Sequence, residues 1–94
     1  MKIVGADKLD KFKKKHPSSR VPLDRWVMVV KAAKWNKYGD IKLTFNSVDK
    51  VGDIFVFNIK GNDFRLIAEV IFQGNLVIIK NIWDHKTYDK KQLK

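Results

Sequence analysis

Three side chains in the second half of this 94-residue chain could act together on a phosphodiester: Arg65, His85 and Tyr88. A guanidinium presents a planar pair of donors to phosphate oxygens and stabilises negative charge as it develops. An imidazole transfers protons near neutral pH, and a tyrosine can donate a proton or stack on a base. RNA carries its own nucleophile, the 2′-hydroxyl beside each phosphate. The three residue types therefore suit RNA cleavage that requires no metal ion.

The charge of the chain favours a polyanionic partner. Its 20 Lys and Arg against 10 Asp and Glu give a formal charge of +10, and most of the excess lies in residues 1–50. Such a field attracts polyanions and speeds their association, and phosphate neutralisation dominates nucleic-acid affinity. Nucleic acid is the expected partner. A merely solvated basic surface, or an acidic protein partner, would also account for the charge.

Several kinds of site and location are excluded or disfavoured. Without cysteine there are no disulfides and no thiolate metal sites, and the two histidines, His16 and His85, are far apart in the sequence. The phosphate-binding loop, the dinucleotide fingerprint and the nucleophile elbow are missing, so we expect no cofactor and no metal. No apolar run approaches the roughly 20 residues of a membrane span, and Lys8–Lys15 is charged where a signal peptide would be apolar. We expect one cytoplasmic domain, residues 1–94.

Residues 54–83 must position the candidate site, and their pattern predicts two consecutive β-hairpins. Gly61-Asn62 and Gly74-Asn75 suit the central positions of type II′ turns with two-residue loops. The first loop places Ile59 opposite Phe64 and Asn58 opposite Arg65. The second places Ile71 opposite Ile78 and Glu69 opposite Lys80. Continued to its end, that register pairs Arg65 with Asp84 and puts His85 on the opposite face, so a shared site requires the last strand to end or twist near Trp83.

Cross-strand partners share a face of a sheet, so the expected registers also predict its two faces. One is an apolar core face, which Trp83 should extend. It consists of Phe55, Phe57, Ile59, Phe64, Leu66, Val70, Val77 and Ile79. The second face mixes Ile and Val with Asn58, Lys60, Arg65, Glu69 and Lys80, and we expect it to be bare of helices.

The first half of the chain supplies the layer that covers the core face. Met1–Val4 could be an edge strand, and a short helix should follow an Asp7 cap and end at His16-Pro17. The longest helix is expected over Pro22–Lys34, with Leu23, Trp26, Val27, Val30 and Ala33 on its apolar stripe. Asp40–Phe45 alternates like a strand or an extended segment, and 46–53 reads as a loop. A short C-terminal helix could follow an Asp84 cap. The fold class is α+β: two N-terminal helices on one face of a small, mainly antiparallel meander.

Three ordered blocks carry a resemblance to a known family. They are 57–67 (Phe-Asn-Ile-Lys-Gly-Asn-Asp-Phe-Arg-Leu-Ile), 76–80 (Leu-Val-Ile-Ile-Lys) and 85–89 (His-Lys-Thr-Tyr-Asp), and 45–51 supports them. Together they resemble the HigB-type toxins of bacterial toxin–antitoxin pairs, within the RelE-like group. The resemblance implies the RelE-like fold and a ribosome-dependent mRNA endonuclease. It also implies neutralisation by a partner antitoxin, expected to be a helix-turn-helix DNA-binding protein.

The resemblance also indicates which positions matter. The strand Arg and the C-terminal block correspond to Arg65, His85, Tyr88 and Asp89, and Asp84 stands where the family often has Thr. We expect Arg65, His85 and Tyr88 to be catalytic, with either His85 or Tyr88 as the general base. The expected RNA-binding residues are Lys50, Asn58, Lys60, Lys86 and Asp89.

Each assignment has a structural alternative. Arg65 could bond only Asp63 or Glu69, His85 could simply begin a helix, and Tyr88 could anchor the last segment to the core. Asn58 and Lys60 could bond only across the hairpin. Two other functions also fit the composition: a basic module that binds RNA or DNA without cutting it, and a regulator that binds only protein.

Overall fold

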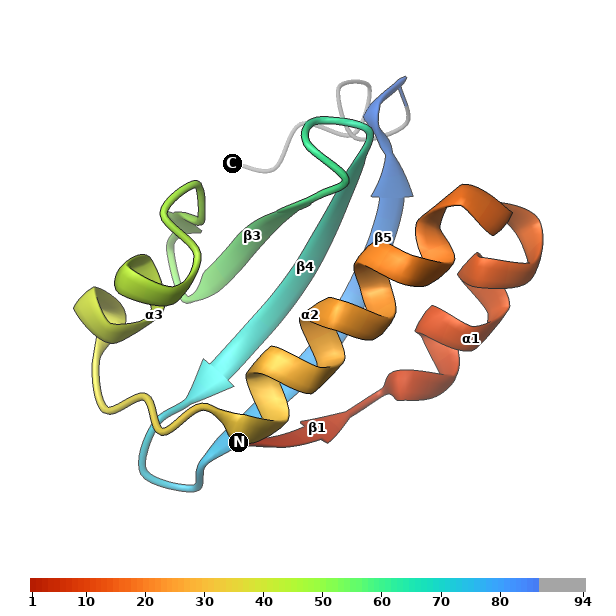
Figure 1. Ribbon diagram of the computed structural model, residues 1–94. Helices are drawn as coiled ribbons and strands as arrows, with labels where there is room; N and C mark the ends of the chain where they lie inside the picture. The colour runs from red at the N-terminus through yellow and green to blue at the C-terminus, as the bar shows by residue number, and fades with distance from the viewer. Residues whose placement is uncertain (87–94) are drawn as a thin grey trace.

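The structure is a computed structural model that describes residues 1–86, and it consists of a five-stranded sheet with helices on one face (Figure 1). The strands lie in the order β1-β5-β4-β3-β2; β1 pairs in parallel with β5, and the remaining neighbours are antiparallel. This arrangement confirms the expected α+β class. Along the chain the elements are β1 Lys2–Val4, α1 Ala6–Lys15, the 3₁₀ turn η1 Pro17–Ser19, α2 Arg20–Ala32, α3 Tyr38–Thr44, β2 Asp49–Val51, β3 Ile54–Ile59, β4 Phe64–Ile71 and β5 Leu76–Asp84.

Helix α2 crosses the core face of the sheet, with α1 beside it (Figure 1). Its expected stripe is confirmed: Leu23, Trp26 and Val30 are buried, and Val27 and Ala33 pack partly buried against the same core. The indole of Trp26 meets the ring of Phe57 edge-on, with their centroids 5.4 Å apart. Full burial of each large apolar side chain contributes roughly 1.5–3 kcal/mol, so this stripe holds the helical layer on the sheet.

Helix α1 begins differently from expectation. Its N-cap is Gly5, with φ +93°, and not Asp7, which lies in the first turn. A Cβ at Gly5 would stand 2.9 Å from the carbonyl oxygen of Ile79, so both the dihedral and the close approach to β5 require glycine. The expected edge strand before it is confirmed as β1, whose Val4 pairs with Ile78.

Within the segment Asp40–Phe45, residues 40–44 are helical and Phe45 is the C-cap of this helix, so the expected strand or extended conformation is wrong. The buried Ile41 of α3 and its partly buried C-cap Phe45 are four residues apart, whereas Leu43 between them is 88% exposed. The N–H of Asn36 donates to a carboxylate oxygen of Asp40 at 2.9 Å, which fixes the entry to this helix. Part of the expected loop 46–53 instead forms the edge strand β2.

The first hairpin confirms the expected register. Ile59 pairs with Phe64, Asn58 with Arg65 and Phe57 with Leu66. Within the turn the N–H of Asp63 donates to the carbonyl of Lys60 at 3.2 Å, and Gly61 has φ +62° at the first central position. Glycine adopts such a positive φ without steric cost.

The second hairpin does not follow the expected register. Ile71 pairs with Leu76 and not with Ile78, because the loop has four residues and the left-handed position is Asn75, with φ +53°, while Gly74 is not left-handed. A β-bulge then shifts the pairing by one residue: Ala68 pairs with Ile79 but Ile67 pairs with Asn81, which leaves Lys80 as the extra residue. After the bulge Arg65 faces Trp83, and the expected pairing of Arg65 with Asp84 is wrong.

The core face is confirmed, since all eight of its expected members are buried in one cluster. Trp83 does not extend it, because its partner is Arg65 on the second face. That second face is not uniformly exposed, as Val56 and Ile67 on it are each only 2% exposed. The backbone is helical at His85 and Lys86, and the rest of the expected C-terminal helix lies outside the described residues.

Candidate nucleic-acid site

Three residues form a row across the second face of the sheet. Asn58 on β3 and Trp83 on β5 are the direct cross-strand partners of Arg65 on β4. Partners in neighbouring antiparallel strands project from the same face with their Cβ atoms roughly 4.5–5.5 Å apart. The fold therefore places an amide, a guanidinium and an indole side by side at the end of the sheet where β5 finishes.

The guanidinium of Arg65 is held by the β3–β4 turn. Its Nη1 donates to the carbonyl oxygen of Asn62 at 2.9 Å and to that of Phe64 at 3.3 Å, and the residue is half-buried. Both acceptors are backbone carbonyls, and they orient the guanidinium at the turn. Glu69, one of the two carboxylates considered for Arg65, instead forms an ion pair with Lys80 at 3.5 Å.

His85, the residue after β5, is bonded to the same β3–β4 turn. Its backbone N–H donates to the carbonyl oxygen of Asp63 at 2.9 Å, and its side chain is exposed. Arg65 and His85 are thus fastened to adjacent residues of one turn, Asn62 and Asp63, and the packed core does not separate them. The bulge makes this possible, because it brings Trp83, two residues before His85, to the Arg65 side.

Asn58 and Lys60 line a hollow of about 420 Å³ between β3 and the start of α2. Arg25 and Trp26 form part of its opposite wall, and Lys60 also makes an ion pair with Asp63 at 3.6 Å. Within the described part of the chain, the buried Nε1 of Trp26 has no hydrogen-bond partner. The positive charge of Arg25 and Lys60 at the hollow suits the phosphate of a nucleotide.

The other expected site residues do not belong to the row formed by Asn58, Arg65 and Trp83. Lys50 is exposed on the edge strand β2 opposite Phe55, so the structure sets it on the core side of the sheet and not in the Arg65 row. Lys86 is exposed directly after His85. Tyr88 and Asp89 lie outside the described residues, so their roles stay predictions.

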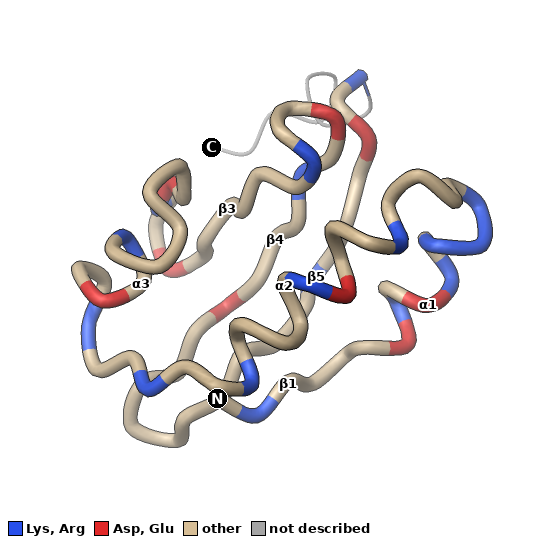
Figure 2. The backbone as a smooth tube through the Cα atoms, viewed as in Figure 1, with Lys and Arg blue, Asp and Glu red and all other residues tan. Residues whose placement is uncertain are grey.

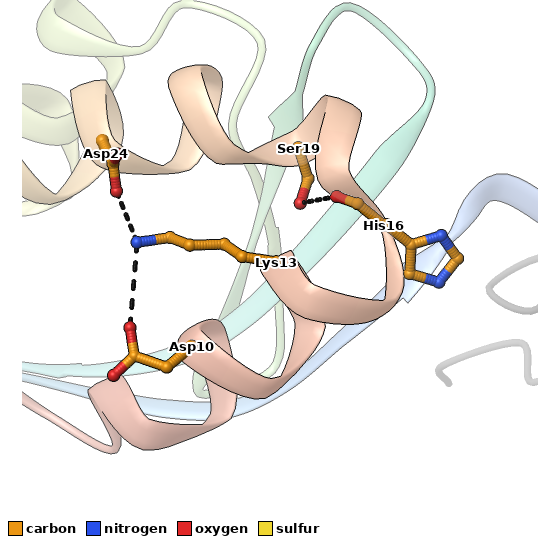
Figure 3. Close-up of polar contacts among 5 residues, drawn as sticks. All are labelled: Asp10, Lys13, His16, Ser19 and Asp24. Atoms are coloured by element: carbon orange, nitrogen blue, oxygen red, sulfur yellow. Dashed lines mark hydrogen bonds and ion pairs between the residues drawn. The ribbon is translucent and has the colours of Figure 1, made fainter.

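The sequence pattern did not indicate two residues, Arg25 and His16, that line hollows near this end of the sheet. Arg25 lies one turn after the exposed Val21 on α2, and only the packing of α2 against β3 brings it to the hollow. His16 stacks on Phe12 with centroids 4.3 Å apart and lines a hollow of about 220 Å³ with Trp83 and Asp84. Figure 3 shows its ring directed away from its own carbonyl, which accepts a hydrogen bond from Ser19 Oγ at 2.6 Å. No local sequence pattern predicts that either residue lies near the site.

The positive charge is not spread evenly over the backbone (Figure 2). Lysines crowd the C-terminal end of α1, where the helix dipole favours cations. One of them, Lys13, is largely compensated, since it lies between Asp24 and Asp10, the latter 3.8 Å away (Figure 3).

Residues 1–86 contain no group of three or more His, Asp or Glu placed to hold a metal ion, and no helix among them is long and apolar enough to cross a membrane.

This fold and this site define a small basic α+β protein with an Arg–Trp row and a histidine at one end of its sheet. A family model described as the RelE-like toxic component of a toxin–antitoxin system, HigB toxin, matches residues 19–91, and the chain belongs to this family. The expected family is confirmed.

Relatives agree with the family match along nearly the whole chain. The mRNA interferase toxin HigB of Escherichia coli strain K12 is 26% identical over 92 residues, which cover 95% of this chain and 88% of the relative. The mRNA interferase HigB of Shigella flexneri shows the same identity and coverage. The mRNA interferase HigB of Escherichia coli O6:H1 is 24% identical over 93 residues, 96% of this chain and 90% of the relative. These names agree with the expected endoribonuclease.

Proposed function

We propose that this chain is an mRNA interferase: a toxin that cleaves mRNA on the ribosome, in the cytoplasm, and so inhibits translation. Family membership implies a cognate antitoxin, and the relatives bear the name mRNA interferase. The observation that carries the proposal is the attachment of Arg65 and His85 to consecutive residues of one turn. A phosphate-binding cation and a proton-transferring group are the minimum that phosphodiester cleavage by the 2′-hydroxyl needs.

The proposed reaction is an internal transesterification. The 2′-oxygen attacks the adjacent phosphorus, the bond from phosphorus to the 5′-oxygen breaks, and a 2′,3′-cyclic phosphate and a 5′-hydroxyl result. One proton leaves the 2′-hydroxyl for a general base, and one is delivered to the departing 5′-oxygen. His85 and Tyr88 are the candidates for these two transfers, in either order.

The remaining residues bind and orient the RNA. Arg65 stabilises the extra negative charge on the phosphate, with a guanidinium already aimed by two carbonyl acceptors. Lys60 and Asn58 hold a neighbouring nucleotide in the hollow they line, and Lys86, Lys50 and Asp89 are further RNA contacts. No step requires a metal ion, because the nucleophile belongs to the substrate and the charge is met by side chains.

The antitoxin is the second partner in the proposal. It is a helix-turn-helix DNA-binding protein that covers the basic face of the toxin or keeps the toxin off the ribosome. A non-catalytic RNA- or DNA-binding module remains the alternative, since the basic surface alone would suffice for it.

The test combines cells with purified components. Induction should arrest growth, and co-expression of the adjacent open reading frame should relieve the arrest. In vitro, a defined mRNA should be cut at discrete positions when ribosomes translate it, and a 2′-deoxy substitution at a cut position should abolish that cut. Salt-dependent RNA binding with intact mRNA would instead support the binding module.

A further inference from the structure

Helix α1 and strand β5 enclose a lysine-lined groove that the proposed chemistry does not use. It consists of two adjoining hollows of about 280 and 220 Å³, which share Phe12, Lys15 and Ile82 as walls. We propose that this α1–β5 groove binds the phosphate backbone of the RNA strand that continues beyond the cleaved bond. This inference deepens the proposed function and rests on it.

The lysines of α1 divide into two sets by their contacts. Lys8, Lys11 and Lys15 line the groove, whereas Lys13 is compensated on another side of the helix by Asp10 and Asp24 (Figure 3). Residues spaced three and four apart lie on one face of a helix. The groove therefore has a row of three ammonium groups over about 10 Å of helix axis, at a rise of roughly 1.5 Å per residue.

The chemistry of the row fits phosphates. A lysine ammonium acts as a compact point charge for phosphate and tolerates a backbone of variable geometry. Among the other lining residues, Asn81 supplies an amide and Phe12 supplies an aromatic ring. A positive groove with aromatic contacts is a common arrangement for single-stranded nucleic acid that is bound without regard to sequence.

The position of the groove favours RNA over an acidic protein segment. Its second hollow ends at Trp83 and Asp84, directly before His85 and beside the end of the Arg65 row. The lysines lie along the rest of the groove, so an anionic strand that follows them reaches the end of the Arg65 row. A strand held at Arg65 and His85 would reach the groove by passing Trp83 and Asp84 at the end of β5.

The test is equilibrium binding of a fluorescent 2′-O-methyl oligoribonucleotide of about 12 nucleotides, long enough to span the site and the groove. This probe cannot be cleaved, so the result does not depend on catalysis. The groove variant is K8Q/K11Q/K15Q. Its matched control, K14Q/K31Q/K37Q, removes the same charge from exposed positions that do not line this groove.

We expect the groove variant to bind at least roughly tenfold more weakly than the wild type. The slope of log affinity against log salt should also become shallower by about 2, because each lost phosphate contact on a single strand removes about 0.7 from the slope. The control should keep most of the affinity. The variant K8R/K11R/K15R should bind like the wild type, and unchanged thermal midpoints would show that all three variants fold.

Three results would overturn the groove proposal. The groove and control variants could lose affinity equally, which would mean that only overall charge matters. The groove variant could bind RNA normally yet lose affinity for an acidic peptide, which would make the groove a protein-binding surface. The wild-type chain could fail to bind the probe at low salt. None of these depends on whether mRNA is cut on ribosomes, so the groove and the proposed activity fail separately.

Discussion

Arg65 on β4 lies directly opposite Trp83 on β5. This pairing exists because the β5 bulge at Lys80 offsets part of the displacement introduced by a four-residue loop after Ile71. A two-residue loop without a bulge would pair Arg65 with Asp84. The longer loop and the bulge together move the partner of Arg65 by one residue, to Trp83. A difference of one residue exchanges the faces of a strand, so it decides that Trp83 shares a face with the guanidinium and not with the core.

Replacing Arg65 tests the charge-stabilising role. Arg65→Ala should reduce cleavage of ribosome-bound mRNA roughly 10²–10³-fold, the usual loss when a charge-stabilising donor is removed. Arg65→Lys should restore little, because a lysine cannot keep two carbonyl contacts and still present a planar fork to phosphate. The measurement is single-turnover cleavage, with thermal unfolding in parallel. Activity of the alanine variant close to that of the wild type would remove Arg65 from the site.

The two histidines form a natural pair of test and control. His85→Gln should lower the cleavage rate about 10²–10⁴-fold, the range for loss of a general acid or base, while the exposed position leaves stability unchanged. The backbone bond from residue 85 to Asp63 survives this substitution. His16→Gln should leave the single-turnover chemical step intact and affect only RNA binding, since the His16 ring packs on Phe12 and Phe64 and lines the hollow beside Trp83. Equal losses in the two variants would contradict the assignment.

Lys60 tests the hollow beside α2. Lys60→Gln should raise KM several-fold with a smaller change in kcat, because the side chain is exposed and its proposed contact with the strand is made through charge alone. Lys37→Gln removes the same charge at the start of α3 and serves as the control. A fall in kcat without a change in KM would instead place Lys60 at the reacting phosphate.

Gly5 tests the packing of α1 against β5, and Gly39 in α3 serves as its comparison. Gly5→Ala should destabilise the fold by about 1–3 kcal/mol, because it forces a side chain into a left-handed residue and against the Ile79 carbonyl. Gly39→Ala, inside α3 with open space around its Cα, should stabilise it by about 0.4–1 kcal/mol. Chemical denaturation of both variants gives the comparison. A Gly5→Ala protein as stable as the wild type would show that α1 can shift away from β5.

Much of this fold could be predicted from local pattern, and the exceptions have physical causes. The α2 stripe and the first hairpin follow from strong periodicity and from a glycine in the expected place. A strand or extended segment is predicted over Asp40–Phe45 because Ile41 and Phe45 satisfy both a strand alternation and the i, i+4 spacing of a helix. The second turn misled because Asn75, and not Gly74, takes the positive φ.

The site was harder to predict than the fold. The residue types of Arg65 and His85 pointed to phosphodiester chemistry, but their proximity depends on a bulge that no local pattern marks. Arg25 and the groove lysines reach their places only through the packing of helices on strands. Long-range packing, and not residue identity, determines which polar groups converge.

The most direct measurement maps cuts in a defined mRNA by primer extension after incubation with initiated ribosomes and the purified chain. The proposal predicts discrete cuts by the wild-type chain that require the ribosome. It also predicts that Arg65→Ala and His85→Gln lose them while remaining folded. An uncut mRNA with the wild-type chain, or cutting by both variants at the wild-type rate, would contradict it.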